Sequence, residues 1–157
     1  MSTPAPSYRP DGYHSVTPYL VLDDAARAIA FYRDAFGARE VLRMDMPGGK
    51  IAHAEVEIGD SRIMLSDENP AWDSKGPKMI GGTPVSLMIY VEDCDAVYAQ
   101  ALSAGAKSVM PVQDQFYGDR SGSVEDPFGH KWHISTCKEV LSPEELQRRA
   151  TALFAQT

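Results

Sequence analysis

Two histidines three residues apart give the first hint of chemistry in this sequence. They lie in the stretch EDPFGHKWHIS, residues 125–135, as His130 and His133. Imidazole is a common metal ligand and a common acid or base near neutral pH. Successive residues of a strand point to opposite faces, so His130 and His133 cannot act as one metal-binding pair. We expect His130, which directly follows the DPFG turn, to be structural, and His133 to face a ligand site.

A second candidate group lies in the alternating stretch IAHAEVEI, residues 51–58. His53 and Glu55 are two residues apart, so they share one face of the predicted strand. A carboxylate beside an imidazole orients the ring and favours its protonated form, which suits proton transfer. The predicted catalytic candidates are therefore His53, Glu55 and His133. The alternative is that His53 and Glu55 are ordinary hydrogen-bonding residues of a solvated strand face.

The same alternation predicts a face where a few polar groups lie among aromatic and apolar side chains, as in small-molecule pockets. The loop QFYGDR is a further candidate, because an arginine there can bind a carboxylate or phosphate through two parallel hydrogen bonds. The alternative for that loop is a surface pair between Asp119 and Arg120. The expected ligand-binding residues are Thr17, Tyr19, Ser86, Met88, Tyr90, Tyr117 and Arg120.

The elements that must position these residues are encoded twice. SVTPYLVLDDAARAIAFYRDAFGAREV in the first half parallels PVSLMIYVEDCDAVYAQALSAGAKSV in the second, and each half reads as strand, helix and three strands. This pattern predicts an α+β fold in which two tandem βαβββ modules form curved mixed sheets around a cup, followed by a C-terminal helix. The predicted boundaries are a flexible tail 1–14, a domain 15–137 (module one 15–66, connection 67–83, module two 84–137) and a helical segment 138–157.

Composition excludes some classes of protein. The net charge of −7 disfavours attraction to nucleic acid or anionic lipid, and no apolar run approaches membrane-spanning length. The N-terminal residues lack the apolar block of a signal peptide. The two cysteines fit no metal-binding spacing. We therefore expect a cytoplasmic protein that binds neither nucleic acid nor membranes.

The βαβββ repeat, the FYRDAFGA helix end, the GD hairpin and the DPFGHKW turn together resemble the vicinal oxygen chelate superfamily. That superfamily includes glyoxalase I, extradiol dioxygenases, fosfomycin-modifying enzymes and bleomycin-binding proteins. The stretches HAEVEIGDSRIMLSDE and QFYGDRSGSVEDPFGHKW look like its PhnB-like, glyoxalase-like branch. In metal-dependent members the cup holds a divalent metal on side chains of the first and last strand of each module. The resemblance places these positions at Thr17, Ile63, Ser86 and His133, and only His133 is a ligand.

Three functions follow as expectations. The first is a small-molecule-binding protein with a metal-free cup and no cofactor. The second is a metal-dependent lyase, isomerase or dioxygenase with a divalent metal at a displaced site of His53, Glu55 and His133. The third is an antibiotic-sequestering resistance protein without catalysis. The resemblance also implies a homodimer, because the superfamily often completes its cups with a partner subunit.

Overall fold

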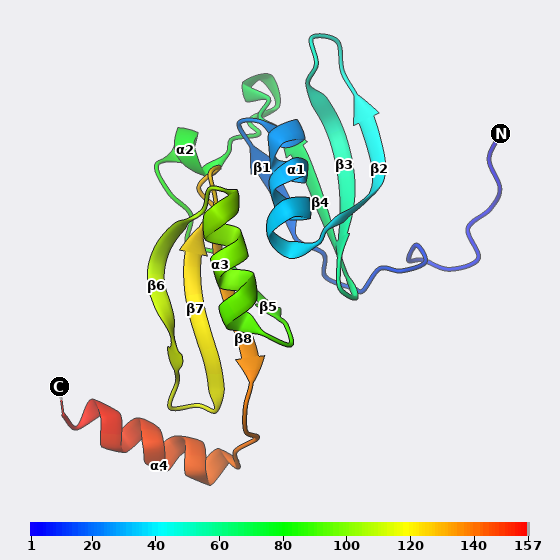
Figure 1. The fold of residues 1–157 in the computed structure, drawn as a ribbon. Coiled ribbons are helices and arrows are strands. Elements are labelled where there is room, and N and C mark those ends of the chain that lie inside the picture. Colours follow the sequence, from blue (N-terminus) through cyan, green and yellow to red (C-terminus); the bar gives the residue numbers. More distant parts are fainter. Residues whose placement is uncertain (157) are drawn as a thin grey trace. The chain divides into compact units, whose positions relative to one another are not determined.

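The computed structural model describes residues 1–156; Thr157, the last residue of the predicted segment 138–157, lies outside the described residues. The chain divides into two compact units, Met1–Gly82 and a second unit that begins at Thr83. Each unit contains one four-stranded sheet (Figure 1). Within residues 1–156, no helix is both long and apolar enough to cross a membrane.

The first unit has the order strand, helix, three strands. In its sheet the strand order is β1-β4-β3-β2, with β1 parallel to β4 and the other neighbours antiparallel. A short 3-10 turn and the helix α2 follow in the connection. The elements are β1 (Tyr19–Leu22), α1 (Ala25–Phe36), β2 (Arg39–Asp45), β3 (Ile51–Ile58), β4 (Ser61–Asp67), η1 (Pro70–Trp72) and α2 (Pro77–Ile80).

The second unit repeats this order. Its sheet has the strand order β5-β8-β7-β6, again with one parallel pair at the first strand. The elements are β5 (Ser86–Tyr90), α3 (Cys94–Ala104), β6 (Lys107–Asp114), β7 (Asp119–Glu125), β8 (Lys131–Cys137) and α4 (Pro143–Phe154). The predicted α+β fold of two tandem βαβββ modules with a C-terminal helix is therefore confirmed.

Helix α1 forms because its sequence has capping residues at both ends and an apolar stripe along one side. The Asp24 carboxylate accepts a hydrogen bond from the amide of Arg27 at 3.1 Å, and Gly37 ends the helix in the left-handed conformation at φ 70°. The buried face of the helix packs on the apolar side of the sheet, which we call the helix face. The buried helix residues are Ala25, Ala28, Ile29, Phe31, Tyr32 and Ala35.

The two units have equivalent helix starts, which fixes the alignment of the repeat. In the first unit the buried Asp67 carboxylate accepts hydrogen bonds from the amides of Ala25 (2.9 Å) and Ile51 (2.7 Å). In the second, the Thr136 hydroxyl accepts one from the amide of Cys94 at 3.0 Å. Asp67 and Thr136 are therefore equivalent positions at the end of the last strand of each unit.

The DPFG turn is built around Asp126. Its buried carboxylate accepts hydrogen bonds from the amides of Phe128 and His130 and from the indole N–H of Trp132, each at 2.9 Å. The Gly129 amide closes the turn on the Asp126 carbonyl at 3.1 Å. The turn thus orders the start of β8, and the backbone amide of His130, the residue after the turn, takes part in it.

Three local predictions need correction. Strand β1 begins at Tyr19, after Thr17, because Pro18 has no N–H to donate to a ladder. Strict alternation along residues 51–58 would place Ile51 on the same face as His53. Ile51 is instead buried, because the pairing of β2 with β3 shifts register between Met44 and Asp45. Tyr13, assigned to the flexible tail 1–14, is also buried.

Candidate functional site

The side of the first sheet that turns away from α1, its open face, carries a chain of three polar side chains. The Tyr19 hydroxyl lies 2.9 Å from Nδ1 of His53, and Nε2 of His53 lies 3.2 Å from Oε1 of Glu55. Strand pairing explains the arrangement, because Tyr19 and Glu55 both lie opposite Met64 in the ladder. Two of the predicted catalytic residues, His53 and Glu55, are therefore brought together with the predicted ligand-binding residue Tyr19.

Electrostatics assign directions to these hydrogen bonds. Burial opposes ionisation of Glu55, but the neighbouring Tyr13 hydroxyl and His53 ring outweigh it, so the pKa of Glu55 lies below its usual value. An ionised carboxylate only accepts, so Nε2 of His53 donates to Glu55. In the neutral ring Nδ1 then accepts a hydrogen bond from the Tyr19 hydroxyl. This chain is able to pass a proton between Tyr19 and the imidazole.

The open face of the second sheet carries His133 in a different environment. Its Nδ1 lies 2.6 Å from the Ser123 hydroxyl and its Nε2 lies 3.1 Å from the Ser86 hydroxyl. On the same face the buried hydroxyls of Ser121 and Ser135 bond each other at 2.7 Å. The floor of this face is thus a row of small hydroxyl groups around one imidazole.

An aromatic and a thioether side chain lie beside the His133 floor on the neighbouring strand β5. Met88 lies opposite His133 and Tyr90 lies opposite Ser135 in the ladder, and both side chains are exposed. The Tyr90 hydroxyl donates to Asp119 at 2.9 Å, and this carboxylate, followed by burial, raises the pKa of Tyr90. Met88 and Tyr90 therefore lie where the sequence predicted them, next to His133 and Ser86.

The other predicted ligand-binding residues lie elsewhere. Arg120 belongs to β7 on the helix face, where it holds Asp95 of α3 through two hydrogen bonds of 2.7 and 2.9 Å. It also pairs with Asp114 at 3.2 Å, so the partners of this guanidinium are not the predicted Asp119. Tyr117 is half-buried with its ring edge against Phe116. Arg120 is therefore separated from the His133 floor by the sheet itself.

The alignment of the repeat corrects one of the positions that the resemblance assigned to a metal ligand. Because Asp67 and Thr136 are equivalent, the counterpart of His133 is Met64, whereas Ile63 is buried on the helix face. The four positions are therefore Thr17, Met64, Ser86 and His133. Among residues 1–156, no three His, Cys, Asp or Glu side chains gather closely enough to hold a metal ion. The donor set at these positions does not fit a divalent metal.

Sequence reasoning missed three residues of the second open face. Asp119, Ser121 and Ser123 alternate along β7, and each is buried opposite a residue of β8. Their period of two in DRSGSVE was a usable signal, but the start of the strand was placed after Arg120. The helix face of the same strand has Gly122, where an added Cβ would lie 2.7 Å from Cγ2 of Val112 and 3.0 Å from the Tyr98 ring.

Comparison with known proteins agrees with this architecture. An uncharacterized protein of Mycobacterium tuberculosis (strain H37Rv) is 43% identical over 136 residues, which cover 85% of this chain and 80% of that protein. The crystal structure of TioX from Micromonospora is 25% identical, with a TM-score of 0.61, over 82% of this chain and all of that one. An Arabidopsis thaliana gene product has a TM-score of 0.64 and 24% identity, over 78% and 98% of the two chains.

The family profile covers both units. Residues 13–134 match the profile described as Glyoxalase/Bleomycin resistance protein/Dioxygenase superfamily, a range that begins at Tyr13 and includes His53, Glu55 and His133. Two tandem βαβββ modules, a polar face on each sheet and this match together identify the chain as a member of the Glyoxalase/Bleomycin resistance protein/Dioxygenase superfamily.

Proposed function

We propose that this protein binds a small organic molecule on its open faces without a metal at the superfamily positions. The observation that supports this most strongly is the environment of His133. Both ring nitrogens bond serine hydroxyls, Ser123 on one side and Ser86 on the other. With both ring nitrogens engaged the ring is held in place, and the exposed Ser86 hydroxyl keeps hydrogen-bonding capacity for a ligand.

The surroundings favour a ligand with a flat apolar body and a few polar groups. Met88 and Tyr90 offer exposed apolar and aromatic surface, and the exposed Ser86 hydroxyl on the same strand can donate or accept a hydrogen bond. The net charge of −7 disfavours strongly anionic molecules. Planar antibiotics and small uncharged metabolites therefore form the first panel to be screened.

The test combines metal analysis with ligand binding. Elemental analysis of protein purified without chelators should give far less than one divalent metal per chain. A thermal-shift screen followed by calorimetry should find a ligand that stabilises the protein by mass action. Ser86→Ala should weaken binding of that ligand by about fivefold to tenfold, as expected for the loss of one hydrogen bond of about 1 kcal/mol.

The control variant is Asp60→Ala in the exposed β3–β4 turn, and it should bind as the parent does. Stoichiometric metal, or a ligand whose affinity is equal in the parent, Ser86→Ala and His133→Ala, would contradict the proposal.

A second candidate is a proton-transfer enzyme, and the Tyr19–His53–Glu55 chain favours it. A carboxylate orients the imidazole, and the imidazole in turn contacts an exposed phenol that a ligand can reach. For an identified ligand, His53→Ala should abolish conversion while binding is retained. Recovery of the ligand unchanged from the parent protein would instead favour sequestration without chemistry, the behaviour of a resistance protein.

We further propose that the protein acts as a cytoplasmic homodimer, an assembly suggested by the superfamily. Exposed apolar side chains on both open faces, among them Tyr19, Met44, Met88 and Tyr90, offer surface for a partner or a ligand. Light scattering coupled to size-exclusion chromatography tests this directly. A mass of 17.2 kDa at micromolar concentration would contradict it.

A further inference from the structure

The N-terminal segment ends in a turn that places one tyrosine on the first sheet. The amide of Tyr13 donates to the Pro10 carbonyl at 3.3 Å, and Gly12 has φ +82°, as a type II turn requires at its third residue. A Cβ at Gly12 would lie 3.1 Å from Nη2 of Arg62 on β4. A close approach to Arg62 and a positive φ therefore both favour glycine here.

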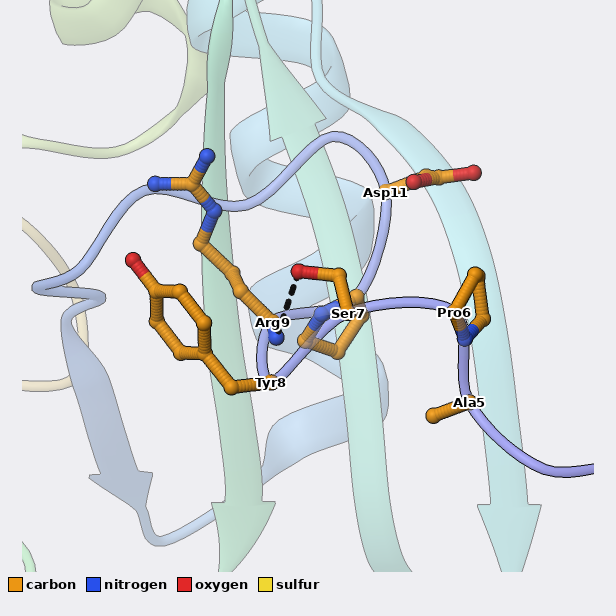
Figure 2. Close-up of a pocket in the computed structure, with 7 residues that line it drawn as sticks. Ala5, Pro6, Ser7, Tyr8, Arg9 and Asp11 are labelled. Atoms are coloured by element: carbon orange, nitrogen blue, oxygen red, sulfur yellow. Dashed lines mark hydrogen bonds between the residues drawn. The ribbon is translucent and has the colours of Figure 1, made fainter.

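The residues before this turn form no site of their own. Figure 2 shows the hollow that residues 5–11 line, in which the Arg9 amide donates to the Ser7 hydroxyl at 3.3 Å. The hollow is lined by this segment alone, and all of residues 1–12 are exposed. The turn at residues 10–13 is the part of the segment that contacts the sheet.

Tyr13 contrasts with the residues before it, because only 9% of its surface is exposed. The Arg62 guanidinium lies over its ring, 5.6 Å from the centroid, and the same arginine pairs with Glu57 at 3.0 Å. The Tyr13 hydroxyl is buried without a hydrogen bond of ordinary geometry to any described residue. It lies close enough to Glu55 for the two groups to shift each other's pKa.

We propose that Tyr13 is a positioning residue for the Tyr19–His53–Glu55 chain, and that the turn at residues 10–13 is a strap that closes the Glu55 end of the first open face. This inference rests on the proton-transfer candidate above and extends its site to the N-terminal segment. His53 contacts Glu55 on one side. The strap approaches from the Arg62 side: Arg62 lies opposite Glu57, the next residue of β3 on this face, and the Tyr13 ring packs on Arg62.

The surroundings of Glu55 are consistent with this role. Its cross-strand neighbours, Leu42 on β2 and Met64 on β4, are apolar. The ionisable groups that act on it are His53 on its own strand, Tyr13 on the strap and Arg62 on β4. Two causes raise the pKa of Tyr13 to about 12: burial first, and the Glu55 carboxylate second. The phenol therefore stays protonated at neutral pH and can donate toward Glu55.

The test compares Tyr13→Phe with Tyr13→Ala in the full-length protein. Titration of the Glu55 carboxyl carbon by NMR should show that Tyr13→Phe raises the pKa of Glu55 toward its ordinary value, because the hydroxyl is lost and the ring is kept. In the converse experiment Glu55→Gln should lower the pKa of Tyr13, followed by ultraviolet absorbance of the phenolate. Resonances of the His133 ring, in the other unit, should be unchanged in Tyr13→Phe.

Hydrogen exchange separates positioning from simple packing. Tyr13→Ala should speed exchange of the amides around Arg62, whereas Tyr13→Phe should leave them as in the parent, because the ring still covers the guanidinium. An unchanged pKa of Glu55 in Tyr13→Phe would overturn the positioning role, and unchanged exchange in Tyr13→Ala would overturn the strap. Both readouts are taken without ligand, so a failed search for a ligand or reaction would contradict the proposed function and leave this inference standing.

Discussion

The buried carboxylate of Asp126 offers the sharpest test of whether the DPFGHKW motif is scaffold or site. It accepts three hydrogen bonds of 2.9 Å, from the amides of Phe128 and His130 and from the Trp132 indole. Asp126→Ala would leave three donors unsatisfied, and Trp132 has no exposed surface. A lost partner costs about 1–3 kcal/mol per buried donor, so the loss of three should cost the variant about 3–9 kcal/mol. That is a large share of the roughly 5–15 kcal/mol that stabilises a typical domain.

Urea unfolding followed by circular dichroism measures this loss. Trp132→Phe removes one of the three donors, so the double variant with Asp126→Ala should cost less than the sum of the single variants. Lys131→Ala, at an exposed neighbouring position, is the control and should change the free energy of unfolding by less than about 0.5 kcal/mol. A loss below about 1 kcal/mol in Asp126→Ala, or strict additivity with Trp132→Phe, would refute the reasoning.

Three further outcomes are expected. Gly122→Ala should destabilise the second unit by about 1–3 kcal/mol in the same unfolding assay, because its Cβ would press on the Val112 side chain and the Tyr98 ring; an unchanged midpoint would refute this. Arg120→Ala should cost at most about 1 kcal/mol, because its pair with Asp95 is exposed, and ligand affinity by calorimetry should not change. The pKa of Glu55 is lower in the folded state than its ordinary value, so its stabilising effect is present above about pH 4.5 and is lost as pH falls through the folded pKa. Glu55→Gln should therefore flatten the acid side of the stability–pH curve.

Much of the fold was predictable because its signals are local. Asp24 and Gly37 mark the ends of α1 through cap chemistry, and the repeat shows the same pattern a second time. Strand periodicity placed His53 and Glu55 on one face and separated His133 from His130. These relations depend only on the geometry of a single element, which the order of residues determines.

The register between neighbouring strands was harder to predict from the sequence. The resemblance assigned Ile63 to the position that Met64 occupies, and aligning the two units at their hairpins is misleading because the hairpins differ in length. The side of the sheet that Arg120 occupies was also misjudged, since it depends on where β7 begins. A shift of one residue moves a side chain to the opposite face, so small errors in turn length become large errors in the site.

The sequence by itself determined the repeat, the helices, the turn around Asp126 and the residue types available to each face. Only the tertiary structure decided which of them meet: Ser86 with His133 across 47 positions, Tyr19 with His53 across 34, and Tyr13 with Arg62. The physical reason is that periodicity acts within one element, whereas these contacts depend on how several strands and a distant turn pack together. Side-chain pairing across a sheet follows register, and register is set by the whole unit.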